Sequence, residues 1–573
     1  MDKISKKNKM TKEIQILRNR FKKYSIDGYI VPKNDDYFNS YSGVNRLKII
    51  SNFSGSAGIA IILKNKNFLF TDGRYTIQSQ IESGKNFKIK NIEELVDCNL
   101  FSNLCLGIDP KLFTYQQIKK FFLKRNKIKF IEENLIDDIK THRTQKFYPF
   151  FSLKKNVVGE SRFSKINKIS KILKKKNSDY LFVSAPENVA WILNIRGRDC
   201  PNSPMPNARL LVSKSKKIFL ISNFKKCEKL IKQKIINFKE LIDTNDFSKK
   251  ILSLIGKNCI IDNKSCSIFY ENLIKSNFKI IGREDPTYNL KSIKNKTEIK
   301  HMKNTHITDG VALTKFIYWI KNINKKKITE VEAQDKLEKF RKISKNYLYP
   351  SFNTIAGSGK NGAIVHYRAT KKNCRVIQAN DIFLFDSGGQ YKYGTTDVTR
   401  TICFSSPTKN IKDVFTKVLK GHIAVATVNL NKNNTGKKID SIARKFLKKD
   451  NLDYAHGTGH GVGFFLNVHE GPQSLSKINK VKLKEGMILS NEPGYYKKNK
   501  FGIRIENLVF IKKYNQKLFF ENLTMAPIEK DLINLKLLTP FEKKYLFKYH
   551  LDIYSKISKY LNFNERKWLA SFI

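Results

Sequence analysis

The chain has 573 residues, of which 40% are apolar and 28% charged, and it carries a formal net charge of +59. At roughly 100 to 200 residues per domain, this length predicts three or four domains with buried cores. No segment approaches the roughly 20 consecutive apolar residues of a membrane helix, which excludes a helical membrane protein, and the basic start MDKISKKNKMTKE lacks the apolar region of a signal peptide.

The positive charge admits two explanations. Taken alone, it predicts a polyanionic partner such as nucleic acid. The lysines are, however, spread along the whole chain, and they accompany abundant Asn, Ile, Phe and Tyr, which share A/T-rich codons. Genome composition explains the excess better than a binding function does, so a nucleic-acid partner is not expected.

The cysteines indicate the compartment. Eight are scattered from Cys98 to Cys403 without a CxxC pair. In a chain of this length the pattern predicts free thiols and a cytoplasmic location.

The amino-terminal half contains a repeated pattern of helix, strand and hairpin. A helical pattern leads into a strand at Tyr29 and again at Tyr180. A hairpin follows from Ala57 and again from Ala208, 28 positions after the strand in both cases. We therefore expect two copies of one α/β unit, offset by about 151 residues, with a chance match of common elements as the alternative.

Three sequence patterns predict the organisation of the rest of the chain. A polar, basic segment near residue 290 predicts a domain boundary before a long helix. In residues 350–510 glycines cluster and five of the nine histidines appear, which predicts a β-rich region whose loops build a site. Further on, Thr539, Pro540 and Glu542 have the spacing of an N-cap, a first helical residue and an N3 residue, so a helix should begin there.

Two aspartates are the first candidate site residues. Asp386 ends an apolar strand, and Asp397 precedes a β-branched return strand, so a hairpin would bring both carboxylates together. Two carboxylates at such a short distance repel each other unless a cation lies between them. Ordinary acids at strand ends are the alternative for this pair alone.

Three further groups follow in stretches with Gly or Pro. His460 lies in HGTGHGVG, whose four glycines let the backbone approach a ligand. Glu492 precedes a Pro-Gly turn, and Glu506 lies in the predicted strand Gly502–Val509, where a carboxylate is costly to bury unless paired or metal-bound. Arg504 points to the same side of that strand, so a plain ion pair with Glu506 is the alternative.

In this order the residues resemble those of the pita-bread metallopeptidases, a family that includes methionine aminopeptidase, prolidase and aminopeptidase P. The family's ligands are Asp, Asp, His, Glu and Glu, with ten residues between the aspartates, as between Asp386 and Asp397. The matching motifs are DSGGQYKYGTTDVTR, HGTGHGVG, VHEGP, NEPGYY and GIRIEN. FSGSAG, TDGRY, SAPENVAWILNIRG and LLTPFEKKYLFKYH are similar to the three-domain form of aminopeptidase P and extend the likeness over nearly the whole chain.

The resemblance implies a mixed α/β (α+β) fold. It consists of two tandem creatinase-like α/β domains, a pita-bread catalytic domain and a C-terminal helical extension, which we expect at residues 1–155, 156–290, 291–514 and 515–573. Creatinase shares the fold but lacks the metal ligands, and methionine aminopeptidase lacks the long N-terminal half, so both match less well.

The resemblance also implies the ligands of two divalent metal ions: Asp386, Asp397, His460, Glu492 and Glu506. Asp397 and Glu506 would bridge the ions, Asp386 would complete one, and His460 with Glu492 the other. An oxygen-rich site with one imidazole favours Mn²⁺, with Zn²⁺ and Co²⁺ as alternatives.

Catalytic and substrate-binding roles follow from the same resemblance. Glu492 would move a proton, His366 would stabilise the developing oxyanion, and His469 would contact the substrate around proline. His456 would line the same pocket, and Arg504 would lie behind the ligands. A strand histidine satisfied by local bonds is the alternative for His366.

The expected activity is hydrolysis of the N-terminal Xaa-Pro bond of peptides by a hydroxide that bridges two metals. The expected enzyme is a cytoplasmic homodimer with no membrane partner. Prolidase, which cuts Xaa-Pro dipeptides, is the nearest alternative, and a non-catalytic basic pita-bread binding module is the alternative of another class. The intact ligand set favours an enzyme, and the doubled N-terminal unit with the C-terminal segment favours aminopeptidase P.

Overall fold

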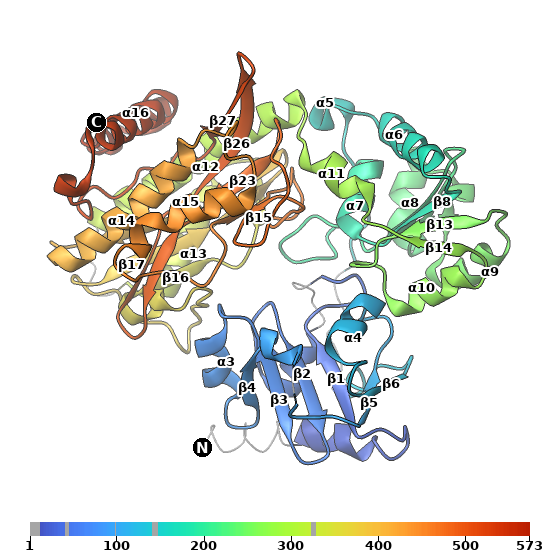
Figure 1. Cartoon of the computed structure of the whole chain (residues 1–573). Helices are drawn as coiled ribbons and strands as arrows, with labels where there is room; N and C mark the ends of the chain where they lie inside the picture. The colour runs from blue at the N-terminus through green and yellow to red at the C-terminus, as the bar shows by residue number, and fades with distance from the viewer. Residues whose placement is uncertain (1–11, 40–44, 98, 140–146, 323–327) are drawn as a thin grey trace. The chain divides into compact units, whose positions relative to one another are not determined.

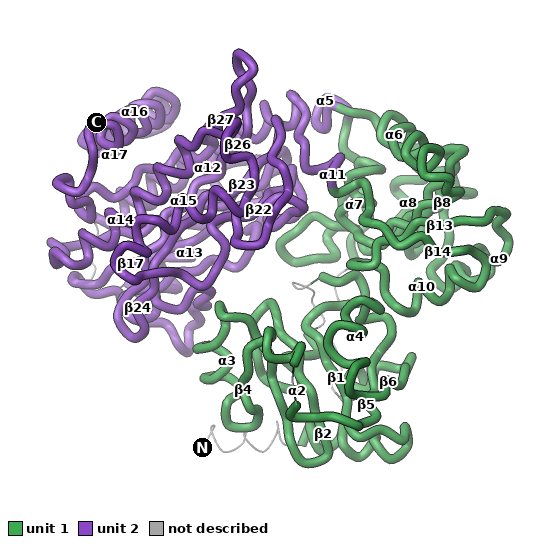
Figure 2. The backbone as a smooth tube through the Cα atoms, viewed as in Figure 1, with its two compact units in different colours: residues 1–154, 160–288 green, residues 155–159, 289–573 purple. Residues whose placement is uncertain are grey.

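The structure is a computed structural model and describes residues 12–39, 45–97, 99–139, 147–322 and 328–573. The chain forms two compact units, unit 1 with residues 1–154 and 160–288 and unit 2 with residues 155–159 and 289–573 (Figures 1 and 2). Cys98 and the basic residues 1–11 lie outside the described residues, and the other seven cysteines are free thiols. Within the described ranges, no helix is both long and apolar enough to cross a membrane.

The first part of unit 1 is a six-stranded sheet with its helices. Residues 12–19 are helical and precede the first strand. The elements are β1 (Gly28–Pro32), α2 (Arg46–Ser51), β2 (Ile59–Leu63), β3 (Asn67–Thr71), α3 (Thr76–Ser83), β4 (Lys88–Asn91), η1 (Ile92–Leu95), β5 (Cys105–Ile108), α4 (Tyr115–Phe121) and β6 (Lys127–Phe130). The strand order is β4-β3-β2-β1-β5-β6, with an antiparallel β1–β2–β3 centre and parallel strands on both sides.

The second part of unit 1 repeats this arrangement. Its elements are β7 (Phe151–Ser152), α6 (Arg162–Lys175), β8 (Tyr180–Val183), α7 (Pro186–Leu193), β9 (Ile195–Arg196), β10 (Arg209–Ser213), β11 (Ile218–Ile221), α8 (Phe224–Lys232), η2 (Phe238–Glu240), β12 (Leu241–Ile242), η3 (Thr244–Asp246), α9 (Phe247–Leu252), β13 (Asn258–Ile261), α10 (Ile268–Lys275) and β14 (Lys279–Gly282). The order β12-β11-β10-β8-β13-β14 has the same topology as the first sheet.

The two sheets also share their register. Tyr29 of β1 pairs with Ile62 of β2. Tyr180 of β8 pairs with Ser213 of β10, and both partners stand 151 positions further along the chain. The strands are apolar and buried in both copies, so each needs helices on its faces. The predicted repeat is therefore confirmed.

Unit 2 begins with a helical layer on two small sheets. The elements are α5 (Lys155–Val158), α11 (Pro286–Ser292, whose first residues belong to unit 1), α12 (Lys296–Asn322), α13 (Glu330–Lys342), β15 (Tyr347–Pro350), β16 (Ile355–Ser358), η5 (Gly359–Ala363), β17 (Ile382–Ser387), β18 (Gly389–Tyr391), β19 (Gly394–Thr395) and β20 (Val398–Cys403). The sheets are β16-β17-β20 and β15-β18-β19. Phe316 of α12 packs edge-on against Phe385 of β17, with ring centroids 5.1 Å apart.

A second layer of helices and strands follows. It comprises α14 (Lys409–Ala426), α15 (Gly436–Lys448), β21 (Gly459–His460), β22 (Ser474–Leu475), β23 (Ile488–Asn491), β24 (Gly494–Lys497), β25 (Phe501–Arg504), β26 (Asn507–Tyr514) and β27 (Lys517–Asn522). The two helices add to the predicted β-rich region 350–510, which did not include them. Their signal was present, because Ile439, Ala443 and Leu447 recur at helical spacing and are buried on one face of α15.

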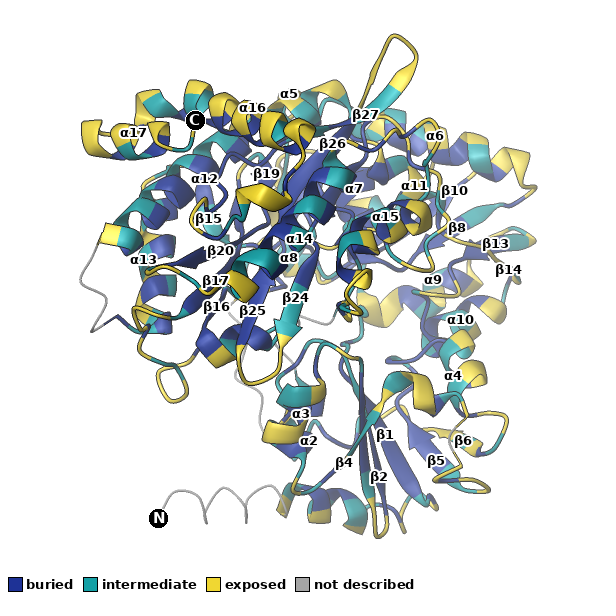
Figure 3. Cartoon of the chain, turned by 60° about the vertical axis from the view of Figure 1, so that its left-hand side comes forward, coloured by how far each residue is buried: buried dark blue, intermediate teal, exposed yellow. Residues whose placement is uncertain are grey.

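The chain continues into η6 (Leu535–Leu537), α16 (Pro540–Ile557), η7 (Ser558–Tyr560) and α17 (Phe563–Ala570). Thr539 caps α16 in a capping box with Glu542, and Pro540 is its first residue, as predicted. Ile553 and Leu546 of α16 belong to the same buried core as Ile503 of β25. Figure 3 shows the resulting contrast between buried strands such as β17 and β20 and the exposed turns of the outer helices.

Candidate metal centre

Asp386 and Asp397 are brought together by two antiparallel strands. Asp386 near the end of β17 pairs in register with Thr399 of β20, and Asp397 immediately precedes β20. The residues between the aspartates include the short hairpin β18–β19. Both residues are buried, at 8% and 4% exposure. The predicted hairpin with two acids is therefore confirmed.

His460 of β21 directs its Nε2 atom toward the acids. Its Nδ1 donates to the carbonyl oxygen of Gly461 at 3.0 Å, which leaves Nε2 free to accept or to bind a cation. Nε2 lies 3.3 Å from Asp397 Oδ2 and 3.5 Å from Glu492 Oε1. The Ser490 hydroxyl joins the two segments, because it accepts from the backbone N–H of His460 at 2.9 Å and donates to Glu492 Oε1 at 3.1 Å.

The glycines around His460 allow neighbouring backbone to approach, and the predicted close approach to a ligand stays a prediction. A Cβ atom on Gly459 would lie 2.0 Å from the carbonyl oxygen of Ser490. One on Gly461 would lie 2.0 Å from the carbonyl oxygen of Glu470. The glycines therefore let the segments that carry the site residues pack directly on one another.

Glu506 lies at a break between two strands, and the prediction of one continuous strand is wrong. β25 ends at Arg504, and β26 begins at Asn507. Thr399 Oγ1 donates to Glu506 Oε2 at 2.6 Å, and the Glu506 backbone N–H donates to the Thr399 carbonyl at 3.1 Å. Arg504 pairs with Asp386, Nη2 to Oδ2 at 2.7 Å, so the alternative of a plain Arg504–Glu506 ion pair is also wrong.

The five side chains converge into one buried, acidic cluster. Ligand atoms of Asp397, His460 and Glu506 all lie within 4.8 Å of one another. Burial raises the pKa of Asp397 and of Glu506 well above the ordinary values, and the neighbouring carboxylates add to both shifts. Burial also raises the pKa of Glu492. Such mutual repulsion is relieved by cations.

The donor set fits two divalent ions. It offers four carboxylates and one imidazole, a combination that suits hard divalent metals. Within the described structure, the buried Oδ1 atom of Asp386 has no hydrogen-bond partner. A buried oxygen atom without a protein partner, beside carboxylates that repel one another, is expected where a metal ion binds.

Arg504 connects the cluster to His456. Besides its bond to Asp386, its Nε donates to Thr399 Oγ1 at 3.0 Å and its Nη1 donates to the Tyr496 hydroxyl at 2.6 Å. That hydroxyl lies 2.8 Å from Nε2 of His456, whose Nδ1 donates to the Gly457 carbonyl at 2.8 Å. Burial raises the pKa of Tyr496 to about 12, so its hydroxyl keeps its proton and can donate to His456.

The remaining predicted histidines lie on segments that adjoin the site. His469 is exposed, and its ring lies edge-on to that of His460 with centroids 4.2 Å apart. His366 is half-buried in a turn after η5, not in a strand. η5 packs against β25, where a Cβ atom on Gly502 would lie 1.8 Å from the Gly362 carbonyl oxygen.

Three functional contacts were not predicted: Thr399, Ser490 and Tyr496. Thr399 stands two residues after Asp397, and Ser490 two residues before Glu492, so strand alternation would have placed each on the face of its acid. Tyr496 lies in the motif NEPGYY, four residues after Glu492. Each supports a charged group by a hydrogen bond that the sequence alone does not reveal.

A second group of possible ligand atoms is already satisfied by a lysine. Cys403, Glu529 and Asp531 lie close together. The ammonium group of Lys321 sits among them, 2.6 Å from Glu529 and 2.9 Å from Asp531. Burial raises the pKa of the Cys403 thiol to about 12, which disfavours its thiolate form in the metal-free protein.

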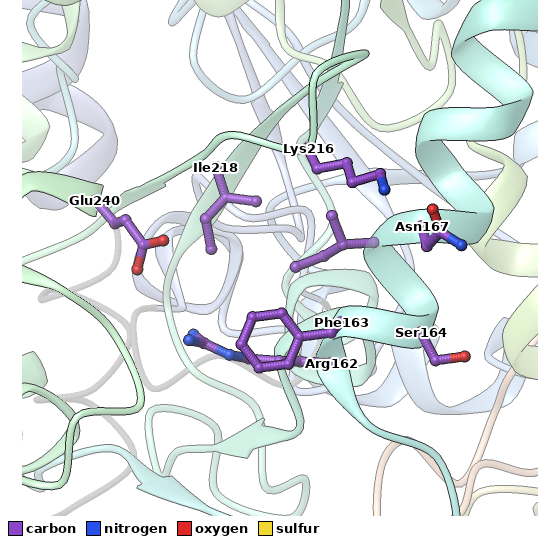
Figure 4. A pocket seen from close by; sticks show the side chains of 8 residues that line it. Arg162, Phe163, Ser164, Asn167, Lys216, Ile218 and Glu240 are labelled. Atoms are coloured by element: carbon purple, nitrogen blue, oxygen red, sulfur yellow. The ribbon is translucent and has the colours of Figure 1, made fainter.

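A hollow of about 540 Å³ lies in unit 1, beside the start of α6 (Figure 4). One carboxylate lines the hollow, so it offers fewer possible metal ligands than the acid-rich cluster of unit 2. The lining residues are Arg162, Phe163, Ser164, Ile166, Asn167, Lys216, Ile218 and Glu240.

Comparison with known families covers most of the chain. The family model for metallopeptidase family M24 matches residues 300–513. The creatinase/prolidase N-terminal domain matches residues 141–298, and the C-terminal region of peptidase M24 matches residues 516–571.

Individual relatives agree with these matches. "Probable Xaa-Pro aminopeptidase P" of Laccaria bicolor is 36% identical and covers 98% of this chain and 92% of its own length. Xaa-Pro aminopeptidase 1 of Dictyostelium discoideum is 36% identical, with 96% and 93% covered.

Solved structures resemble the whole chain or its catalytic part. X-prolyl aminopeptidase of Caenorhabditis elegans, described as a cytosolic enzyme with a di-nuclear active site, has a TM-score of 0.90 at 28% identity and covers 98% of this chain and 99% of its own. The prolidase of Pyrococcus horikoshii has a TM-score of 0.52 at 25% identity, with 64% and 99% covered. The likeness over nearly full length favours the aminopeptidase over the prolidase alternative. Together, this likeness and the acid cluster exclude the non-catalytic alternative. The chain therefore belongs to metallopeptidase family M24, with creatinase-like N-terminal and pita-bread domains, as a metal-dependent Xaa-Pro aminopeptidase of the aminopeptidase P type.

Proposed function

We propose that two Mn²⁺ ions are held by Asp386, Asp397, His460, Glu492 and Glu506. Asp397 and Glu506 would serve both ions, Asp386 would complete the ligands of one, and His460 with Glu492 would complete those of the other. The observation that carries this proposal is the convergence of Asp397, His460 and Glu506 within 4.8 Å, in a group of four acids of which Asp386 pairs with Arg504. Manganese is favoured because oxygen ligands dominate the site.

When bound, two such ions activate a water molecule and polarise the scissile carbonyl. We assign the proton transfer to Glu492, which takes a proton from the attacking water and delivers it to the proline nitrogen as the C–N bond breaks. The Ser490 hydroxyl orients this carboxylate by its bond to Oε1. Water oxygen ends on the acyl carbon, and the first residue leaves as a free amino acid.

The histidines around the site recognise the substrate. His469 is exposed beside His460, in a position to contact the peptide around proline. His456 is oriented by Tyr496 and lines the same pocket. His366 donates to the developing oxyanion, a role we infer from its motif and from the packing of η5 against β25. An Xaa-Pro bond has no N–H, so recognition has to use the proline ring and the flanking carbonyls.

The assembly and domain limits are part of the proposal. We assign residues 1–155 and 156–290 to two creatinase-like domains, 291–514 to the catalytic domain and 515–573 to the C-terminal extension. The chain works as a cytoplasmic homodimer on peptides, without a membrane or nucleic-acid partner. The free thiols support this location, as does the description of the nematode relative as cytosolic. Light scattering of the purified protein should give twice the chain mass of 66.6 kDa.

A peptide panel tests the activity. With Mn²⁺, the enzyme should release the first residue from an Xaa-Pro-Tyr tripeptide and leave the Xaa-Ala-Tyr and N-acetylated tripeptides intact. An Xaa-Pro dipeptide should be a poor substrate, and preferred cleavage of that dipeptide would support a prolidase instead.

A paired substitution tests the site. Glu492→Ala should lower kcat by at least about 100-fold, the lower end for loss of a proton-transferring group. Glu485→Ala removes an exposed carboxylate seven positions earlier and serves as the control, with activity unchanged. Equal activity of the two variants would contradict the assignment.

A further inference from the structure

Arg400, the third residue of β20, is a buried guanidinium without a carboxylate partner. Its exposure is 1%, and among the described residues it forms no ion pair. A buried cation is costly unless polar groups replace its water. Its donors reach neutral oxygens at 2.7 to 2.9 Å: the carbonyls of Thr399, Glu506, Ala526 and Pro527, the side-chain oxygen of Asn507 and the hydroxyl of Tyr549.

These contacts join the metal centre to the C-terminal extension. On one side, Nη1 donates to the carbonyl oxygens of Thr399 at 2.8 Å and Glu506 at 2.7 Å. On the other side, Nη2 donates to the Tyr549 hydroxyl of α16 at 2.8 Å. The guanidinium is planar and rigid, so a displacement at one edge is transmitted to the other.

The backbone of Glu506 depends on this support. Glu506 lies in the break between β25 and β26, where neither strand pairing includes it. Its N–H is bound by the Thr399 carbonyl, and its own carbonyl is bound by Arg400. A proposed metal ligand is thus held through its main chain by a side chain that the C-terminal extension orients.

Tyr549 is the residue of α16 that completes the connection. Its hydroxyl accepts from Arg400 and donates to the Ala526 carbonyl at 2.7 Å. The side chain is 6% exposed, so water cannot readily replace the hydroxyl. Tyr545, one helical turn earlier, stacks on Tyr549, but its hydroxyl makes no hydrogen bond to any described residue.

We propose that Tyr549 is a positioning residue of the metal centre: its hydroxyl holds the Arg400 guanidinium, and Arg400 holds the main chain at Glu506. The C-terminal extension is then part of the machinery that binds the ions, in addition to being a cover for the core. This inference rests on the proposed metal site.

The test compares Tyr549→Phe with Tyr545→Phe in the full-length chain. Each variant loses one hydroxyl from the same helix, but only the first loses the bond to Arg400. After metal is stripped, Mn²⁺ binding is measured by calorimetry and unfolding by heating in the absence of metal. Tyr549→Phe should weaken Mn²⁺ binding by about tenfold, the lower end for loss of a group that orients a ligand. It should also lower kcat while KM stays within twofold, and Tyr545→Phe should change neither quantity.

The outcomes separate the two proposals. If the wild-type chain binds no Mn²⁺, the proposed metal site itself is wrong. If wild type binds Mn²⁺ and Tyr549→Phe lowers only the unfolding temperature, with unchanged Mn²⁺ affinity and kcat, Tyr549 is merely structural and the inference is overturned. If Tyr549→Phe is unfolded at 25 °C, the same comparison is made on this variant at lower temperature, and unchanged Mn²⁺ affinity there would overturn the inference as well.

Discussion

Thr399→Val removes the hydroxyl that orients Glu506. In the structure this hydroxyl donates to Glu506 Oε2 at 2.6 Å and accepts from Arg504 Nε at 3.0 Å. Glu506 and Arg504 are 1% and 2% exposed, so water cannot take over either bond. Valine has nearly the same shape, and the change therefore isolates the hydroxyl.

The expected loss follows from these contacts. Without the hydroxyl, metal binding has to order the Glu506 side chain, which costs up to about 1.5–2 kcal/mol of rotamer entropy. That free energy corresponds to roughly 10- to 30-fold weaker Mn²⁺ binding, since each 1.4 kcal/mol is a factor of ten. The two lost bonds involve the buried carboxyl group of Glu506 and the buried guanidinium of Arg504, so the metal-free protein should also lose about 2–4 kcal/mol of unfolding free energy.

Thr401→Val is the matched control. Thr401 lies two residues further on β20, is equally buried, and its hydroxyl also makes two hydrogen bonds, to the backbone N–H and carbonyl of Arg504. We expect it to lower stability by about 1–2 kcal/mol and to leave Mn²⁺ affinity within threefold of wild type. Calorimetry of stripped protein and urea unfolding measure both quantities. Equal losses of Mn²⁺ affinity in the two variants would refute the argument that Thr399 acts on Glu506.

Other substitutions and conditions give further expectations. Asp309→Asn, which breaks a buried ion pair with Arg341 (2.7 Å), should cost about 3–5 kcal/mol in urea unfolding at pH 7. Burial raises the pKa of Asp309, but the charge of Arg341 outweighs burial and holds this pKa below the ordinary value. The difference in unfolding free energy between the variant and wild type should therefore shrink as the pH falls below about 4. A pH-independent difference would contradict this. Burial and the neighbouring carboxylates raise the pKa of Asp397 and of Glu506 well above the ordinary values, so stability of the stripped protein should fall as the pH rises above the ordinary carboxyl pKa of about 4, with Mn²⁺ reversing the loss; a rise would contradict the clustering. Gly502→Ala should cost about 1–3 kcal/mol and reduce kcat, because its Cβ atom would collide with the Gly362 carbonyl; unchanged melting would show that η5 can shift freely.

Local sequence patterns predict the repeat in the amino-terminal half and the hairpin of the site. The equal spacing after Tyr29 and Tyr180 reflects identical sheet topology and register, which local periodicity can reveal. The hairpin that joins Asp386 to Asp397 was predictable because apolar strands flank a Gly-rich turn. The C-terminal helix start at Thr539 likewise depends only on neighbouring residues.

Tertiary contacts explain what the sequence could not predict. The sequence around Glu506 alternates apolar and polar residues, as in a strand. In the structure the strand is interrupted there, because Arg504 pairs with Asp386 and Arg400 binds the Glu506 carbonyl. Beside His460, Gly459 packs against Ser490 of β23 and Gly461 against the carbonyl of Glu470, and the glycine pattern alone does not identify these partners. The apolar spacing of α15 is helical, but the Gly and His clusters in the rest of residues 350–510 favour loops and strands.

The central claim is that five side chains hold two ions and that this pair enables cleavage before proline. Calorimetric titration of stripped protein with Mn²⁺, paired with release of the first residue from an Xaa-Pro-Tyr tripeptide in the same samples, tests it most directly. The account predicts two Mn²⁺ per chain and activity that rises as the sites fill. Full activity in the stripped protein, or activity with a chain that binds no Mn²⁺, would contradict it.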